Sequence, residues 1–314
     1  VRTVSEDIPT FFEGGFREQD PRDWWAAFCR LSRRLTDGVP PERIEAVVMS
    51  GQMQDLIPLD GDLEPVCRAI LYSDGRAQEQ AARLERAVGA ERFEEITGNR
   101  CDGSLPLPKL AWLREERPEL FARTRHILIS SKDYLIARLT GACIGDVTAC
   151  STAGAMDIRC KCWSRELLDA AGAEEAMFPR LLASQERAGG VLPEAAAACG
   201  YAPGTPVFAG TGDAGATTLA SGIAAPGQYN VNLGTSGWVA AVSDGPLAGQ
   251  PGVFNLAAMP RDRYINVVPF LNAGNVHGWM AGLAAGFAGR DGADFDRLGE
   301  LLAGSRPGSG GVLF

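Results

Sequence analysis

The sequence lacks an excess of positive charge. Its 30 lysines and arginines are outnumbered by 39 aspartates and glutamates, which leaves a net charge of −9, and no run of basic residues exceeds two. Proteins bind nucleic acids and anionic membranes through clustered positive charge. A dedicated nucleic-acid or membrane-surface binder is therefore not expected.

Long apolar runs and targeting signals are also lacking. The longer uncharged stretches, such as Val276–Gly289, are rich in alanine and glycine, so we expect no membrane span. No basic start, apolar block and small-residue cleavage site mark secretion, and the cytoplasm is the default location. The start at Val1 and the apolar stop at Phe314 favour a fragment of a longer chain.

Histidine is scarce and the eight cysteines are scattered. His126 and His277 lie far apart, and Cys160 and Cys162 have no second pair or histidine nearby. This spacing argues against a zinc site, so we expect no metal ligands. We interpret the cysteines as reduced structural thiols.

The remaining composition is that of an ordinary globular protein, with 46% apolar and 22% charged residues in 314 positions. This length has room for two domains. Near Tyr201–Pro206 a helical, charge-bearing half gives way to strands and turns rich in glycine, alanine and threonine. We place the domain boundary there and expect domains at 1–203 and 204–314.

The first half predicts mostly helices. Asp20 and Pro21, followed by apolar residues at helical spacing, predict a packed helix that uses Trp24 and Trp25 as core residues. Arg43–Met49 predicts a buried strand that runs into a polar turn at 50–55. Further helices are expected at 77–88, 108–116, 130–141 and 164–172.

The second half predicts strands joined by tight turns, at 206–210, 228–233 and 238–242, and then helices at 275–289 and 295–302. Two of the turns, Gly210–Asp213 and Gly234–Gly237, contain a Gly-Thr pair. Such turns can present backbone N–H groups and a hydroxyl to a phosphate. The alternative is that glycine and threonine are simply hairpin residues.

Asp213, at the end of the first Gly-Thr turn, is a candidate general base for phosphoryl transfer. The alternative is an aspartate that bonds its own turn. A second set of polar residues offers the amide, carboxylate and guanidinium groups that line polyol sites. The alternative is that these residues only interact with solvent in loops. The members of this set are Gln52, Gln54, Asp55, Asp74 and Arg76.

Taken together, eight segments in this order resemble the FGGY carbohydrate kinases, and most closely their xylulokinase-like members. The matching segments are Glu18–Pro21 with Trp24 and Trp25, Ser50–Met53, Tyr72–Arg76, Thr97–Asn99 with Pro108–Leu113, Lys132–Leu135 with Leu139–Gly141, Asp146–Thr148, Gly210–Asp213 and Gly234–Gly237.

The resemblance implies an α/β fold of the actin-like ATPase type, with two ribonuclease-H-like domains and a central cleft. It further implies transfer of the γ-phosphoryl group of ATP, with Mg²⁺, to a hydroxyl of a ketose, most simply D-xylulose. Asp213 would be the general base. The implied sugar-facing residues are Gln52, Met53, Gln54, Asp74, Arg76 and Ala214, and the implied phosphate-facing residues are Gly234, Thr235, Ser236 and Gly237. Members of the family are often dimeric, but no residue here argues for a dimer independently.

Two departures from the family pattern leave the sugar open. Gln54 and Ala214 stand where xylulokinases usually carry histidine and asparagine. The opening Asp-x-Gly-Thr phosphate turn and the adenine-binding region are not present in these residues, so we expect this segment alone to bind sugar weakly and turn over no ATP. Kinases for ribulose, glycerol or another polyol, a non-catalytic sugar-binding relative and an actin-like ATPase remain alternatives.

Overall fold

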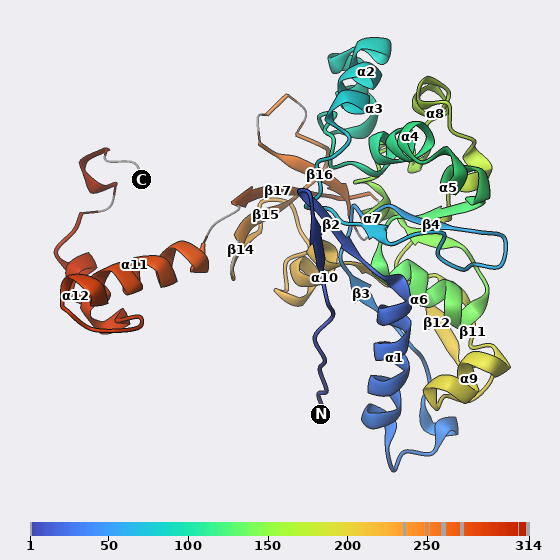
Figure 1. The fold of residues 1–314 in the computed structure, drawn as a ribbon, viewed down its shortest axis with the longest axis horizontal. Helices are drawn as coiled ribbons and strands as arrows, with labels where there is room; N and C mark the ends of the chain where they lie inside the picture. Colours follow the sequence, from blue (N-terminus) through green and yellow to red (C-terminus); the bar gives the residue numbers. More distant parts are fainter. Residues whose placement is uncertain are drawn as a thin grey trace.

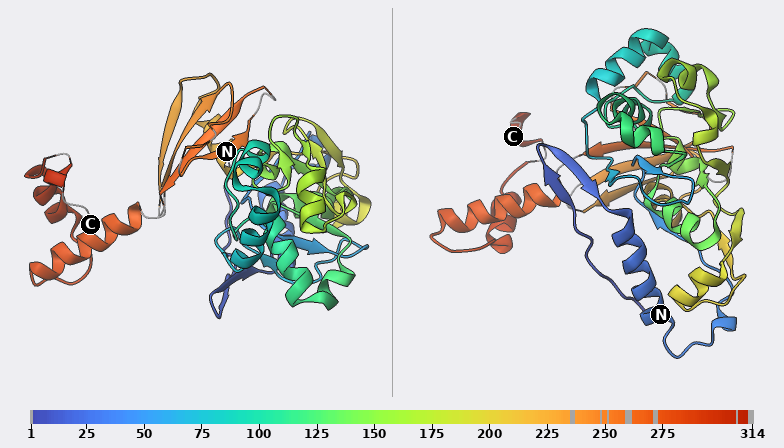
Figure 2. Two further views of the ribbon diagram at one scale, coloured as in Figure 1. Left: turned by 90° about the horizontal axis from the view of Figure 1, so that it is seen from above. Right: turned by 45° about the vertical axis from the view of Figure 1, so that its right-hand side comes forward.

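The structure is a computed structural model, which describes residues 2–234, 237–247, 249–250, 252–258, 262–270, 273–306 and 308–311. A large body of helices and short strands is flanked by a four-stranded sheet, and a pair of helices lies beyond that sheet (Figure 1). The two further views in Figure 2 show the same order of parts.

The α-helices are α1 (Pro21–Thr36), α2 (Gln78–Val88), α3 (Ala90–Thr97), α4 (Pro106–Glu116), α5 (Pro118–Arg123), α6 (Ser131–Thr140), α7 (Val147–Cys150), α8 (Arg165–Ala171), α9 (Pro193–Cys199), α10 (Asp213–Ala220), α11 (Gly274–Phe287) and α12 (Phe295–Ala303). Helices α1 to α10 belong to the large body, and α11 and α12 form the pair beyond the sheet (Figure 1). Short 3₁₀ turns span Pro41–Arg43, Glu175–Met177 and Ser309–Gly311. Among the described residues, no helix is both long and apolar enough to cross a membrane.

The strands of the large body are short, and most are paired two by two. They are β1 (Phe11–Glu13), β2 (Phe16–Gln19), β3 (Ser50–Gly51), β4 (Ile57–Leu59), β5 (Ala69–Ile70), β6 (His126–Leu128), β7 (Ile144–Asp146), β8 (Met156–Asp157), β9 (Cys162–Trp163), β10 (Arg180–Leu182), β11 (Arg187–Gly190), β12 (Pro206–Phe208) and β13 (Thr211–Gly212). The pairs are β4 with β6, β7 with β10, β8 with β9, β11 with β12 and β3 with β13, and the β1–β2 hairpin adds β5.

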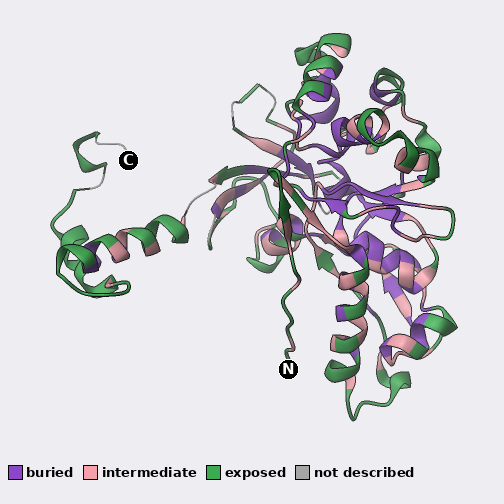
Figure 3. Cartoon of the chain, in the orientation of Figure 1, coloured by how far each residue is buried: buried purple, intermediate pink, exposed green. Residues whose placement is uncertain are grey.

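The flanking sheet is fully antiparallel and has the order β14-β15-β17-β16. Its strands are β14 (Tyr229–Leu233), β15 (Gly237–Ser243), β16 (Phe254–Ala257) and β17 (Tyr264–Phe270). The hairpin predicted from the second Gly-Thr turn is therefore confirmed. The helices predicted near 275–289 and 295–302 are confirmed as α11 and α12, and both are mostly exposed (Figure 3).

The predicted helix ends of the large body are confirmed where capping residues marked them. The Asp20 carboxylate accepts the Arg22 N–H at the start of α1, with Pro21 in the first helical position. The Ser164 hydroxyl caps α8, and Gly141 ends α6 in the left-handed conformation. These signals are local, so the sequence alone could reveal them.

The predicted buried strand at 43–49 is wrong. Only Val47 is buried, where it forms a bridge to Val207, and the Val48 side chain is 69% exposed. Arg43 belongs to a 3₁₀ turn, and in the described structure strand neighbours do not cover both faces of the segment.

The expectation that all the cysteines are reduced is also wrong. Cys160 and Cys162 form a disulfide across the β8–β9 hairpin, in which Asp157 is paired with Cys162. The intervening Lys161 has a φ of 56°, which turns the chain back on itself and brings the two sulfurs together. The other six cysteines are free.

Strands that follow residue 203 pair with strands that precede it. In β12, Val207 packs in the same core cluster as Val47, Ile136 and Leu182. β13 pairs in parallel with β3. The division at 203/204 stays a prediction, and these strands belong structurally with the large body.

Two asparagines join the flanking sheet to the large body. The Asn99 amide donates to the Asn255 carbonyl at 2.9 Å, and the Asn255 N–H donates to the Asn99 side-chain oxygen at 2.8 Å. Nearby, the Ala257 N–H donates to the Ser151 hydroxyl at 2.8 Å. All of these groups are buried, so the sheet is fixed to the body by directional bonds as well as apolar packing.

Candidate active site

The candidate site begins at two parallel strands. In the register of β3 and β13, Ser50 is opposite Thr211 and Gly51 is opposite Gly212. The next residues along the two strands are Gln52 and Asp213. Because the ends of paired parallel strands meet at one edge, an amide and a carboxylate that are remote in sequence emerge side by side.

Glycines allow the chain segments to approach this closely. Gly210 has a φ of +63°, and a Cβ there would overlap the Met49 carbonyl. A Cβ on Gly212 would overlap the Met53 sulfur. The Gly-Thr-Gly run therefore places Asp213 directly against the turn that carries Gln52 and Met53.

Asp213 is the first residue of α10, and its side chain is exposed. The predicted tight turn therefore leads into a helix that sequence analysis missed. Surrounding protein atoms raise the pKa of the Asp213 carboxyl, and a hydrogen bond of 2.7 Å from the Ala214 N–H partly offsets this. A carboxylate with a raised pKa and an open face is suited to accept a proton from a hydroxyl.

The amides of Gln52 and Gln54 are oriented by protein partners. Gln52 Nε2 donates to Asp55 Oδ2 at 2.8 Å, and Gln54 Nε2 donates to Ser104 Oγ at 2.7 Å. Gln54 has a φ of 66°, so the turn is sharp at this position. Gln52 also lines a hollow of about 350 Å³ next to α1, although Asp213 does not contribute to its wall.

Met53 and Ala214 link the turn to the flanking sheet. Both are half-buried and pack on the apolar cluster of that sheet, which includes Ala240, Leu256 and Ile265. The sheet therefore covers one side of the site. Ala214 offers no polar group of its own side chain there.

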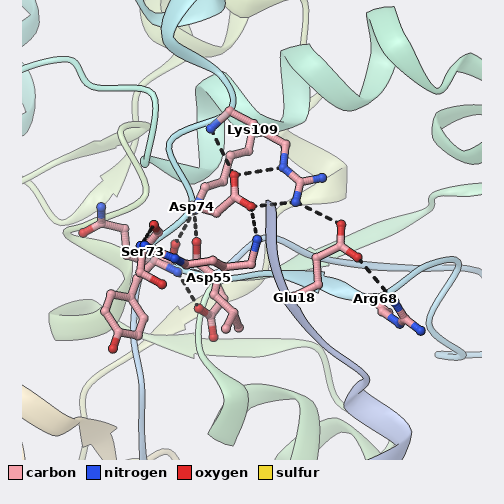
Figure 4. Close-up of polar contacts among 11 residues, drawn as sticks. Glu18, Asp55, Arg68, Ser73, Asp74 and Lys109 are labelled. Carbon is pink, nitrogen blue, oxygen red and sulfur yellow. Dashed lines mark hydrogen bonds and ion pairs between the residues drawn. The ribbon is translucent and has the colours of Figure 1, made fainter. Parts of the chain in front are cut away.

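Asp74 and Arg76 are occupied by protein partners. Asp74 is buried, and its carboxylate accepts two hydrogen bonds from the Arg76 guanidinium, at 2.6 and 2.9 Å. It also accepts a hydrogen bond from the Arg17 N–H. The Arg76 guanidinium, 3% exposed, also pairs with Glu18 at 2.9 Å (Figure 4). It lies over the Phe16 ring, 3.7 Å from the ring centroid. These two side chains hold the β1–β2 hairpin to the body, and their contact with a sugar stays a prediction.

A buried pair of charges lies under the turn, and sequence analysis gave it no role. The Lys109 ammonium donates to the backbone carbonyls of Gln54 and Leu71, at 3.1 and 2.7 Å. Asp55 accepts the Tyr72 N–H at 3.0 Å as well as the Gln52 amide (Figure 4). Burial raises the pKa of Asp55 to about 7, partly offset by Lys109, and burial lowers the pKa of Lys109 to about 8.

The position of Lys109 in the quoted Pro108–Leu113 match was the one signal in the sequence that could have drawn attention to it. The Asp55 and Lys109 side chains fix the backbone of the turn and of Leu71–Tyr72. The Tyr72 side chain is 52% exposed.

The second Gly-Thr turn is described only at its ends, because Thr235 and Ser236 lie outside the described residues. Gly237 is buried, and a Cβ there would overlap the Phe270 ring, so packing alone accounts for this glycine. The Gly234 carbonyl accepts the Gly274 N–H at 2.8 Å. The contact of the Gly234–Gly237 turn with phosphate stays a prediction.

No cluster of three or more histidine, cysteine or acidic side chains in the described part of the chain could hold a metal ion. A magnesium ion that accompanies a nucleotide is held largely by phosphates and needs one or two protein carboxylates. The described residues therefore offer no preformed cluster of ligands, and an ion that arrives with the nucleotide phosphates does not require one.

The site thus combines a strand-end carboxylate with an oriented amide turn on an α/β body, and comparison with known proteins identifies the family. The model of the FGGY family of carbohydrate kinases, N-terminal domain, matches residues 4–220, and the chain belongs to that family. Xylulose kinases of Escherichia coli and Streptomyces rubiginosus are 35% and 37% identical over 78% and 74% of this chain. A gluconokinase of Bacillus subtilis is 27% identical over 95% of it.

Solved structures give the same fold, that of the actin-like ATPases. A xylulose kinase from Lactobacillus acidophilus aligns over all of this chain and 63% of its own, with a TM-score of 0.90 and 24% identity. A related kinase from Brucella ovis aligns over 91% of this chain and 57% of its own, with a TM-score of 0.78 and 28% identity. The chain spans about half the length of the curated xylulose kinases it matches, 49% and 48% for the two named above.

Proposed function

We propose that this protein is part of an ATP-dependent sugar kinase that phosphorylates a hydroxyl of a ketose, with D-xylulose as the first candidate. The observation that carries the proposal is the register of β3 and β13, which delivers Gln52 and Asp213 to one edge. The similarity to proteins named xylulose kinase supports the choice of sugar.

In this mechanism each residue has a distinct task. Asp213 accepts the proton of the attacking hydroxyl, and the Ala214 N–H keeps its carboxylate in place. Gln52 orients the sugar, and Met53 with Ala214 excludes water on the side of the flanking sheet. ATP with Mg²⁺ supplies the phosphoryl group and neutralises charge as the bond forms. The Gly234–Gly237 turn is the proposed phosphate contact on this side of the cleft.

A gluconate kinase is the second candidate, because a gluconokinase is similar over nearly the whole chain. Gln54 and Ala214 also differ from the residues usual in xylulokinases, and both lie at the site.

The deciding experiment measures ADP release by the intact gene product with D-xylulose, D-ribulose, glycerol and D-gluconate, one at a time. Phosphorylation of D-xylulose above the others supports the proposal, and preference for gluconate supports the second candidate. Sugar binding without any ADP release would identify a non-catalytic relative and contradict both.

A further inference from the structure

Two free cysteines from remote parts of the chain meet outside the candidate site. Cys29 on α1 and Cys199 at the end of α9 have their sulfur atoms 3.5 Å apart. Cys29 is half-buried and Cys199 is buried. The distance is that of a hydrogen-bonded thiol pair, and a disulfide needs the sulfurs to approach to about 2.05 Å.

The helices that carry these cysteines are held together by several other contacts. Arg33 on α1 donates to the carbonyls of Ala197 and Ala198 at 2.6 and 2.7 Å. The Tyr201 hydroxyl donates to Ser32 Oγ at 3.0 Å. Because these bonds fix α1 against α9, the sulfurs stay in reach of each other.

The surroundings give the two sulfurs different roles. The hydrogen bond with Cys199 lowers the pKa of Cys29, burial opposes this, and the guanidinium groups of Arg33, Arg138 and Arg30 add to the lowering. The same hydrogen bond, together with burial, raises the pKa of Cys199. Cys29 is also the more accessible of the two sulfurs, so a small peroxide meets Cys29 first and the buried Cys199 follows as the resolving sulfur.

We propose that Cys29 and Cys199 form a redox modification site that reacts with a small peroxide and closes to a disulfide between α1 and α9. First, the Cys29 thiolate attacks a peroxide oxygen, so that an S–O bond forms, the O–O bond breaks and hydroxide leaves as water after taking a proton. Then the Cys199 sulfur attacks the Cys29 sulfur, the S–S bond forms, and the S–O oxygen departs as water with the Cys199 proton. Two thiols are oxidised, and one hydrogen peroxide is reduced to two waters.

The test uses the full chain, reduced with dithiothreitol, freed of reductant and treated with two equivalents of hydrogen peroxide, one for this pair and one for the Cys160–Cys162 pair that dithiothreitol also opens. After alkylation and non-reducing proteolysis, mass spectrometry should find a peptide with Cys29 linked to Cys199, and dithiothreitol should release it. The new cross-link should raise the melting temperature by at least about 3 °C relative to the reduced form.

Matched variants separate the steps. In Cys199→Ser, Cys29 should accumulate as sulfenic acid that dimedone traps. In Cys29→Ser, Cys199 should stay alkylatable. Cys143→Ser, which removes a half-buried thiol elsewhere, should leave the linkage unchanged. If peroxide leaves both Cys29 and Cys199 alkylatable in the wild-type chain, or links either one to another cysteine, the proposal is wrong.

Discussion

The Asp55 carboxylate accepts a hydrogen bond of 2.8 Å from the Gln52 amide nitrogen, and this bond decides which end of the amide faces outward. An ionised carboxylate can only accept, so it holds the NH₂ group inward and leaves the Gln52 carbonyl to receive a hydroxyl proton. Asp55 is fully buried, so it acts on a sugar only through Gln52.

Replacing Asp55 by asparagine should raise the KM for the sugar about 2- to 12-fold, with a smaller change in kcat. The reason is that the Gln52 amide loses its fixed orientation, and the range corresponds to the free energy of one hydrogen bond. The wild-type KM should also rise below about pH 7, where Asp55 takes up a proton and can donate to the Gln52 carbonyl. Steady-state kinetics from pH 6 to pH 8 test both effects. A KM that is independent of pH in this range, or a variant with unchanged KM, contradicts this role.

The same carboxyl should make folding stability fall as pH rises from about 4 to 7. Its pKa is near 3.9 in the unfolded chain and about 7 in the folded protein, so over this range only the folded state holds the proton. Relative to Asp55→Asn, the wild type should lose up to about 1.4 kcal/mol of unfolding free energy per pH unit. Urea unfolding at pH 4.5 and 6.5 measures this difference. Asp62→Asn, at an exposed position, is the control. If the wild type instead gains unfolding free energy relative to Asp55→Asn as pH rises, Asp55 is ionised throughout and the prediction is wrong.

Asp213→Asn should lower kcat at least about 100-fold while sugar affinity changes far less, because the variant keeps the shape of the side chain and removes the proton acceptor. ADP release and sugar titration in the intact gene product give the two values. Asp296, an exposed aspartate in the first turn of α12, is the matched control, and Asp296→Asn should be silent. Retention of most of the kcat by Asp213→Asn would assign the base to another group.

Asp146 is a buried aspartate whose replacement should act on folding stability and not on the chemical step. It caps α7 and lies 2.8 Å from the buried Lys132 ammonium, so Asp146→Asn should destabilise the fold. A lower activity of that variant should follow its lower folded fraction in circular dichroism.

Gln54→His and Ala214→Asn should each improve the use of D-xylulose, because they restore the side chains that xylulokinases usually carry at these positions. One or two recovered hydrogen bonds correspond to about 5- to 150-fold in kcat/KM. Histidine tolerates the positive φ of position 54 better than most residues do. Gln78→His, at an exposed position on α2, is the control. If the unchanged protein already prefers D-xylulose strongly over the other sugars in the panel, the prediction fails.

Asn99→Ala should loosen the flanking sheet, because it removes both side-chain hydrogen bonds to the Asn255 backbone and leaves those groups buried and unpaired. The cost should be about 1–3 kcal/mol. Hydrogen exchange should show lower protection in β16 and β17, with α1 unchanged. The exposed Asn275→Ala on α11 is the control, and equal protection in both variants would show that apolar packing alone holds the sheet.

The sequence by itself determined the features whose causes are local. Capping residues defined the ends of α1, α6 and α8, and glycine next to threonine located the β14–β15 hairpin. The order of the polar turns indicated the family. Asp213 was predicted as the general base because it is the one carboxylate in a turn of small residues.

The tertiary structure decided the features that depend on partners remote in sequence. Asp74 and Arg76 have the chemistry of a polyol site, yet their nearest partners are each other and Glu18, so they stabilise the body. Lys109 gained its role only when folding placed the backbone carbonyls of Gln54 and Leu71 around it. The placement of Gln52 and Asp213 at one strand edge likewise required the pairing of β3 with β13, because residue type sets what a side chain can do and only the paired backbone sets where it lies.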